Sequence, residues 1–372
     1  MLGGLMVVVA FVVILMAHEG GHLVTAKLLN MKATKYFLGF GPTLWSFQRG
    51  ETEYGVKAIP AGGYVRIVGM NALDVVEPHE EARAYRNKPF WQKSVVVMGG
   101  IATHFVIAFV LLWVVNVVIG EPDTSRPLLE VARVIPETEE GSPSAAALAG
   151  MLPGDRVVAV NGRPVDRWSD LSAILRSNPN QRVELDVLRD GTLVRLSATL
   201  SSRADAETGE RVGFLGVSPR VERERDNPIL GVGKAAGDVA LYTRLSVQGI
   251  WLFATNLGTL ANAVVSDDES LDRVRPVSVI GITQFGAASS QAGINVTLEL
   301  IAYIAIFVGV LNAIPLFPFD GGHFVVALYE KVTGRPPDMR KVVPVGAAVF
   351  ALVVMIGILG VYLDIARPLD LG

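Results

Sequence analysis

The sequence predicts an α-helical polytopic membrane protein with four transmembrane helices, a membrane-associated β-hairpin and an inserted extracytoplasmic α+β domain. Hydrophobic residues make up 51% of the 372 residues and charged residues only 19%, which is too apolar for an ordinary soluble chain. Apolar runs near the roughly 20 residues that cross a bilayer recur four times. The predicted spans are residues 1–30, 94–120, 300–323 and 342–366.

Charge and cysteine content limit the possible functions. The net charge of −3 provides no basic surface for a nucleic-acid partner, so none is expected. The chain has no cysteine, which excludes disulfides and thiolate ligands. Any transition metal must therefore be bound by histidine and carboxylate groups. The five histidines are His18, His22, His79, His104 and His323.

The first apolar run is expected to be a retained span rather than a cleaved signal peptide. It has no Lys or Arg ahead of its apolar core and no Ala-x-Ala cleavage site before His18. The following residues, 31–93, are rich in Lys and Arg, so the positive-inside rule assigns them to the cytoplasm and the amino terminus to the outside.

Within residues 31–93, two short strands are predicted at Thr52–Ala58 and Tyr64–Val68, forming a hairpin around Pro60. The preceding segment Tyr36–Trp45 is expected to be a glycine-punctuated loop. The apolar content of the hairpin favours packing against the membrane domain over the alternative of a plain cytoplasmic linker.

Residues 121–220 have mixed charge and short strand patterns, as expected of a soluble domain on the outer side. A short helix, a Pro-Gly turn, a strand and an Asn-Gly turn follow one another between Ser142 and Gly162. A helix at Ser169–Ser177 and a hairpin of Arg182–Leu188 with Leu193–Thr199 come next. This order resembles a PDZ domain, which binds extended peptides by strand addition. The alternative is a structural spacer.

Residues 221–299 are predicted to form a linker that carries an interfacial amphipathic helix. The run Leu245–Ser266 is uncharged, but several of its polar residues fall near one helical face. These residues are Gln248, Thr255, Thr259, Asn262 and Ser266. We therefore expect this segment to lie on the membrane surface instead of crossing the bilayer.

The first span contains the motif His18-Glu19-Gly20-Gly21-His22. Residues four apart share one face of a helix, so both imidazoles can bind one Zn²⁺ while Glu19 remains free as a general base. The alternative is that these groups merely cap an ordinary buried helix. Ionisable side chains are costly inside a membrane, however, and a cluster of them marks a functional site by default.

The third span ends in a stretch that contains Asn312, Pro315, Pro318, Asp320 and His323. Prolines break the helical hydrogen-bond ladder, and irregular backbone at membrane depth is tolerated only where it lines protein or water. Asp320 is therefore predicted to face a cavity and to be the third zinc ligand. His323 is the alternative third ligand, or a residue that contacts and supports one of the ligands. Asp320 reaches the depth of His22 only if the first and third spans are parallel.

Together these features resemble the site-2 protease family of intramembrane zinc metalloproteases. The closest likeness is to the bacterial regulator of sigma E protease type, in a form with a single PDZ domain. The resemblance implies an enzyme of the bacterial inner membrane that acts in regulated intramembrane proteolysis and sigma factor signalling. Its expected substrates are single-span proteins, such as anti-sigma factors, that another protease has already trimmed.

The resemblance also implies residues that contact substrate. Asn312 matches a substrate-contacting position, and the segments before and within the hairpin correspond to re-entrant elements beside the active site. An extended substrate is expected to add to the edge of the hairpin, along Tyr64, Val65, Arg66 and Ile67.

Two departures from the family pattern stand out. The usual Gly-Pro-x-x-Asn of the second span appears as Gly99-Gly100-Ile101-Ala102-Thr103 with His104 next. The second proline near Asp320 is Pro318, which is one place later than is commonest in the family. The role of His104 stays open between a group that supports the ligands, a substrate contact and a polar bridge between helices. A metal transporter and a non-catalytic membrane scaffold are the competing functions.

Overall fold

The computed structural model describes residues 2–71, 74–137, 141–205, 208–258 and 275–368. The chain divides into two compact units. The first combines Met1–Val118 with Asp226–Gly372, and the second is Ile119–Arg225.

Four helices of the first unit are long and apolar enough to cross a membrane. They are Gly3–Leu28 in α1 (Leu2–Leu28), Phe90–Ile119 in α2 (Phe90–Val114) with the short π-helix Val115–Ile119, α8 (Ile294–Asn312) and α10 (Met339–Ala366). This confirms a mostly helical chain with four candidate membrane spans.

The third span differs from its predicted bounds. Residues 300–323 are not one helix, because α8 ends at Asn312 and α9 (Asp320–Thr333) begins eight residues later. The segment between them contains Pro315 and Pro318, which cannot donate helical hydrogen bonds. His323 consequently lies in the first turn of α9 and not at the end of α8.

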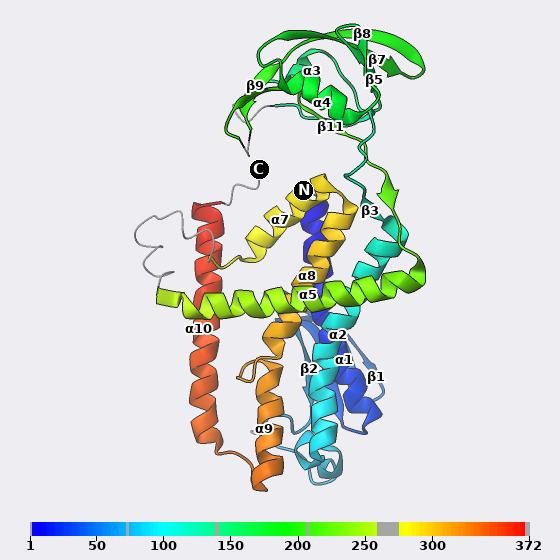
Figure 1. Ribbon diagram of the computed structural model, residues 1–372. Helices are drawn as coiled ribbons and strands as arrows, with labels where there is room; N and C mark the ends of the chain where they lie inside the picture. Colours follow the sequence, from blue (N-terminus) through cyan, green and yellow to red (C-terminus); the bar gives the residue numbers. More distant parts are fainter. Residues whose placement is uncertain (1, 72–73, 138–140, 206–207, 259–274, 369–372) are drawn as a thin grey trace. The chain divides into compact units, whose positions relative to one another are not determined.

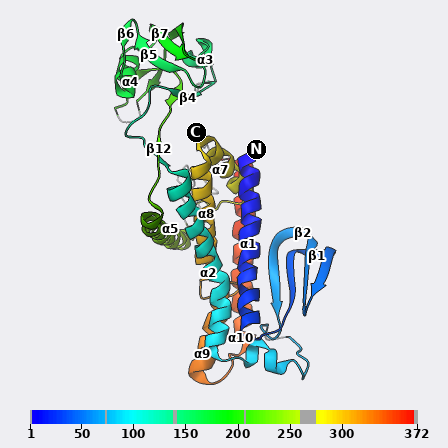
Figure 2. The same ribbon diagram turned by 90° about the vertical axis from the view of Figure 1, so that its right-hand side faces the viewer.

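Helices α1, α2 and α8 pack around a shared apolar core. α1 and α8 lie side by side and run in the same direction, whereas α2 runs in the opposite one (Figure 2). Their fully buried contacts are Val7 and Ile14 from α1, Ala108 and Leu112 from α2, and Ile301, Ala302, Ala305 and Ile306 from α8. Parallel α1 and α8 bring the late part of both helices to one depth.

The β-hairpin consists of two long strands, β1 (Ala33–Arg49) and β2 (Thr52–Ile67). The predicted pairing of Thr52–Ala58 with Tyr64–Val68 is wrong, since the former and most of the latter belong to β2 and both pair with β1. The expected loop Tyr36–Trp45 is also wrong, because it lies within β1.

Glycines explain this difference. Gly39 and Gly41 in β1 and Gly62 in β2 have positive φ, which lets both strands bend back without ending. One half of β1 therefore lies between the two halves of β2, with Tyr36 opposite both Tyr54 and Val65. The stretch Tyr64–Ile67 pairs with β1 on one side, which leaves its other side as an edge.

Helix α5 (Pro228–Thr255) crosses α2 and α8 (Figure 1), and Ala235 packs into their core. The helix starts well before the predicted Leu245, because Asn227 caps it and Pro228 fits its first turn. It is not among the candidate membrane spans. Part of the predicted segment, including Asn262 and Ser266, lies outside the described residues.

Helix α7 (Val279–Ala292) is fastened to the end of α10. The Asp364 carboxylate accepts hydrogen bonds from the backbone N–H groups of Ser278 and Gly281 at 2.7 and 3.0 Å and from the Arg275 guanidinium at 2.8 Å. No residue in the most apolar stretch of α10 is buried by the rest of the described chain, as expected of a helix surrounded by lipid.

The second unit is an α+β fold. Its largest sheet has the order β6-β5-β7-β8, with α3 and α4 packed beside it. The elements are β3 (Glu121–Pro122), β4 (Val131–Val134), α3 (Ala145–Leu148), β5 (Arg156–Val160), β6 (Arg163–Pro164), α4 (Trp168–Arg176), β7 (Arg182–Arg189), β8 (Thr192–Thr199), β9 (Ser201–Ala204), β10 (Arg211–Phe214), β11 (Val217–Pro219) and β12 (Arg223–Glu224).

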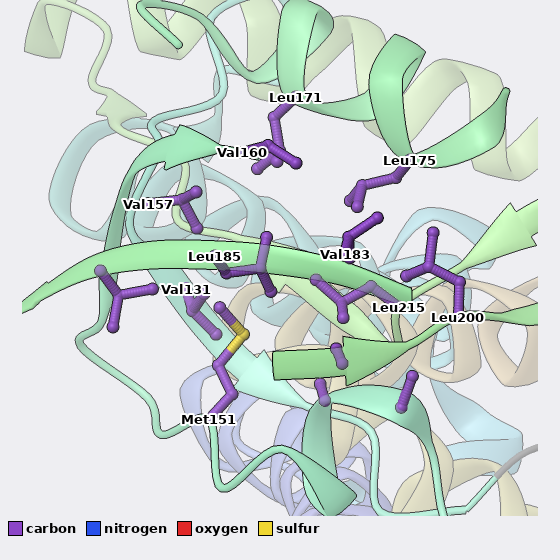
Figure 3. Packing of buried hydrophobic residues seen from close by; sticks show 14 of the residues in the cluster. Val131, Met151, Val157, Val160, Leu171, Leu175, Val183, Leu185, Leu200 and Leu215 are labelled. Atoms are coloured by element: carbon purple, nitrogen blue, oxygen red, sulfur yellow. The ribbon is translucent and has the colours of Figure 1, made fainter. Parts of the chain in front are cut away.

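The core of the second unit is made of aliphatic side chains that alternate along the strands. Val183, Leu185 and Val187 alternate along β7 as its buried residues. Figure 3 shows Leu171 and Leu175 of α4 near Val183 and Leu185 in this core. At the edge of this core Arg189 donates to both oxygens of Asp155. Burial would raise the pKa of Asp155, but these hydrogen bonds outweigh it and hold the pKa below its ordinary value.

Candidate active site

Two buried histidines of α1 and the partly buried Asp320 of α9 converge. His18 Nε2 and His22 Nε2 each lie 3.1 Å from Asp320 Oδ2, and the two imidazole nitrogens lie 3.3 Å apart. The four-residue spacing puts both rings on one face of α1. All three potential ligand atoms therefore lie together, in a cluster that a single ion could bind.

The break between α8 and α9 brings Asp320 to the histidines. Asp320 is the first residue of α9, and the turn before it folds back on the helix start. A Cβ at Gly321 would lie 2.3 Å from the Ile314 carbonyl oxygen, so only glycine fits there. The proline-containing turn thus replaces a straight helix with one that starts at the ligand.

Glycines of α2 make room for the histidines. A Cβ at Gly100 would lie 2.2 Å from His22 Nε2, and a Cβ at Gly21 would lie 2.3 Å from the Gly99 carbonyl oxygen. This close approach lets His22 Nδ1–H donate to the Val96 carbonyl oxygen at 2.8 Å. Such a bond leaves the Nε2 lone pair for a metal and fixes the ring orientation.

The site suits zinc by the chemistry of its donors. Two imidazole nitrogens and one carboxylate oxygen are the protein ligands of many hydrolytic zinc sites, in which a fourth position stays open for water or substrate. The chain has no thiolate that could close that position. His18 Nδ1 is buried without a hydrogen-bond partner among the described residues.

Glu19 lies beside the cluster but does not join it. Its carboxylate turns toward the hairpin, where Oε2 accepts the backbone N–H of Val65 at 2.8 Å. Gly63 keeps this space open, because a Cβ there would lie 2.7 Å from Met16 Sδ and 3.5 Å from Glu19 Cγ. Glu19 therefore lies between the ligand cluster, which is His18, His22 and Asp320, and the edge of β2.

A cleft of about 760 Å³ opens next to that edge. The four predicted substrate residues Tyr64, Val65, Arg66 and Ile67 form one wall. The rest of the lining comes mostly from α9, α10, the turn before α9 and the segment between β2 and the start of α2. His323 also lines the cleft, where its ring meets Phe317 edge-on, and it is not part of the ligand cluster.

His104 and Asn312 lie on another side of the histidines. The His104 ring centroid is 4.8 Å from that of His18, and His104 Nε2 is 3.5 Å from Asn312 Nδ2. The structure thus places every predicted site residue in the first unit, around the ligand cluster or along the cleft.

Sequence reasoning missed the polar far end of the cleft. Lys93 forms an ion pair with Glu330 there, and both line the cleft together with Tyr85. Glu330 is ten residues after Asp320, which is about 15 Å along a helix. Lys93 directly precedes the apolar run of the second span, and this position was the available signal.

A cluster of two buried histidines and a partly buried aspartate with an adjacent glutamate, in a chain with four candidate membrane spans, defines a membrane-embedded metallohydrolase. The model of Peptidase family M50 matches residues 6–356. The chain is 33% identical over 406 residues to the zinc metalloprotease Rip1 of Mycolicibacterium smegmatis, covering 100% of this chain and 98% of the relative.

A second Rip1 relative, from Mycobacterium tuberculosis, is 32% identical over 392 residues, covering 95% of each chain. The zinc metalloprotease RasP of Shouchella clausii is 24% identical over 433 residues, covering 96% of this chain and 97% of the relative. The chain belongs to peptidase family M50 and is a zinc metalloprotease that acts within the membrane. Zinc is its cofactor. The two competing predictions, a metal transporter and a non-catalytic membrane scaffold, are therefore rejected.

Proposed function

We propose that this protease hydrolyses a peptide bond within or near the transmembrane segment of single-span membrane proteins. In this proposal His18, His22 and Asp320 hold the zinc ion, and Glu19 is the general base. The observation that carries it is the position of Glu19, whose carboxylate lies between the ligand cluster and the backbone of Val65 at the cleft.

Zinc bound by these residues would supply Lewis acidity toward the scissile carbonyl and the attacking water. The carboxylate of Glu19 takes a proton from that water and returns it to the leaving nitrogen. His22 keeps its orientation through the Val96 carbonyl. Burial of His18 and His22 excludes bulk water, which strengthens the electrostatic interactions at the site.

The edge of β2 is the proposed binding strand for the substrate. Just beyond the paired strands, the N–H of Val68 donates to the carbonyl of Lys32, the residue before β1, whereas the N–H of Val65 points away from β1 to Glu19. Residues alternate in this way along an antiparallel strand. An extended substrate that pairs with the outward groups recovers hydrogen bonds lost when its helix unwinds, in a medium where each unsatisfied group costs several kcal/mol.

One cleavage assay tests both the function and the binding strand. A single-span protein tagged at both ends is incubated with the purified enzyme, and mass spectrometry locates the new termini. We expect them inside the transmembrane segment. Val65→Pro, which removes the outward N–H that the Glu19 carboxylate accepts, should reduce cleavage by at least about 10-fold, since a hydrogen bond to a charged group is worth roughly 1.5–3 kcal/mol.

Val65→Ile is the matched control, because it alters the side chain and keeps the N–H. It should cleave at nearly the wild-type rate, and both variants should retain zinc. Cleavage confined to the extramembrane flanks would contradict the function. Zinc-loaded Val65→Pro with wild-type cleavage would contradict the binding strand only.

We further propose that the second unit is a PDZ-like domain that controls access of the substrate and takes no part in the chemistry. Its strand and helix order supports the likeness, and every candidate ligand belongs to the other unit. Deleting residues 127–220 should leave cleavage of a short, pre-trimmed substrate within about 3-fold of wild type, because no interaction with the reacting atoms is lost. A zinc-loaded deletion variant without activity would refute this role.

The protein is proposed to lie in the bacterial inner membrane, with the hairpin side in the cytoplasm and the PDZ-like domain outside. The excess of Lys and Arg in residues 31–93 supports this orientation. Because the chain has no cysteine, single cysteines can be labelled selectively. A membrane-impermeant maleimide should label Ser169→Cys in spheroplasts and Glu77→Cys only after lysis. The reverse pattern would exclude this orientation.

A further inference from the structure

His104 is a buried imidazole that the proposed hydrolysis does not use. Its side chain is fully enclosed, with one face near the His18 ring. On the other side it packs against α8 at Gly309, where a Cβ would lie only 2.8 Å from His104 Cβ. Gly309 therefore lets α8 approach α2 closely beside His104.

Among the described residues, Asn312 is the only one whose side chain lies within hydrogen-bonding distance of His104. The distance from His104 Nε2 to the carboxamide is 3.5 Å. The other ring nitrogen, Nδ1, is buried without a partner among the described residues. Asn312 is the last residue of α8, one helical turn after Gly309, so the helix end places its side chain beside the ring.

The distribution of the imidazole proton follows from these partners. A neutral imidazole has one N–H and one bare nitrogen. Nδ1 has no partner in either tautomer, since it is a buried N–H in one and a bare buried nitrogen in the other. We take the tautomer with the proton on Nε2, because that N–H has the carboxamide of Asn312 as its acceptor, whereas an N–H at Nδ1 has none among the described residues. This carboxamide can present its oxygen to Nε2–H by turning through 180°, which directs its NH₂ group away from His104.

We propose that His104 is a positioning residue, which holds the Asn312 oxygen so that the Asn312 NH₂ group donates to the scissile carbonyl oxygen of the substrate. This inference rests on the proposed function, in which Asn312 contacts the substrate. The NH₂ group then stabilises the negative charge that develops on that oxygen. His104 acts only through Asn312 and touches no reacting atom.

The test uses amide side chains that mimic one ring nitrogen each. In His104→Gln the amide nitrogen can occupy the place of Nε2, whereas in His104→Asn the shorter side chain reaches only the place of Nδ1. We expect His104→Gln to keep kcat within about 3-fold of wild type, while His104→Asn and His104→Phe lose at least about 10-fold, the equivalent of one hydrogen bond. KM should change little, since the donor acts on developing charge.

A double-mutant cycle identifies the route of the effect. Asn312→Ala should lower kcat by about 10²-fold, as removal of an oxyanion donor does in other enzymes. Adding His104→Phe to Asn312→Ala should cause no further loss, because the two residues act as one unit. Affinity for a phosphinic peptide, which mimics the tetrahedral state, should fall in parallel with kcat, and zinc content should remain at the wild-type level in all variants.

Several results would overturn the inference. Equal activity of His104→Gln and His104→Asn would show that donation from the Nε2 position is irrelevant. Multiplying losses in the double variant would show that His104 acts independently of Asn312. Zinc loss in His104→Phe would assign the ring to support of His18. Wild-type kcat in Asn312→Ala would show that the Asn312 NH₂ group does not stabilise the charge on the scissile carbonyl oxygen. The proposed function would still stand in that case if Glu19→Gln abolishes cleavage.

Discussion

Glu19→Gln is expected to abolish detectable cleavage while the protein retains its full zinc content. The amide keeps the shape of the side chain and can still accept the Val65 N–H, but it cannot take a proton from water. General bases typically contribute about 10²- to 10⁴-fold to a rate, so the loss should fall in that range or beyond. Zinc should stay because Glu19 lies outside the His18, His22 and Asp320 cluster.

The measurement pairs cleavage of a tagged single-span substrate with metal analysis of the purified variant. Glu53→Gln is a matched control, because Glu53 lies on the same hairpin, accepts a hydrogen bond from Ser46, and is not part of the His18, His22 and Asp320 cluster. It should cleave as the wild type does. Loss of zinc from Glu19→Gln would make Glu19 a ligand, and wild-type cleavage by this variant would exclude it as the base.

Asp320→Ala is expected to lose both the metal and the activity. Asp320 Oδ2 lies 3.1 Å from each histidine nitrogen, and no other carboxylate joins the cluster in the described part of the chain. Loss of a group that merely supports a ligand weakens metal binding by 10- to 100-fold, so loss of a ligand should weaken it by more than about 100-fold.

His323→Ala separates the two candidate ligands on α9. The His323 ring lies against Phe317 along the cleft and outside the cluster, so this variant should retain zinc. The check is zinc content after dialysis against a graded series of chelator concentrations. If Asp320→Ala kept its zinc and His323→Ala lost it, the ligand assignment would have to be reversed.

The convergence of His18, His22 and Asp320 was predictable because its chemistry is local. The spacing of His18 and His22 follows from the helical period, and the prolines before Asp320 mark a break that membrane helices tolerate only in a cavity. The absence of cysteine limited the ligands of any transition metal to histidine and carboxylate, and the spacing of His18, Glu19 and His22 indicated zinc. Four spans were recognisable because crossing a bilayer demands a minimum apolar length.

The hairpin was not predictable in detail because its pairing is non-local. Each half of β2 reads as a separate short strand, and only the positive φ values at Gly39, Gly41 and Gly62 allow β1 to run between them. Glycine in a strand pattern signals a bend or a break equally well. Similarly, the ion pair of Lys93 with Glu330 joins residues 237 positions apart, which no local pattern reveals.

Zinc K-edge X-ray absorption of the purified full chain tests the central claim most directly. The account predicts a first shell of nitrogen and oxygen at about 2.0–2.1 Å, with outer-shell scattering from two imidazoles. His22→Ala should reduce that scattering and the zinc content together. Glu19→Gln should leave the scattering from the protein ligands of the zinc unchanged. A spectrum with no imidazole scattering, or one that His22→Ala leaves unchanged, would contradict the assignment of His18, His22 and Asp320 as the zinc site.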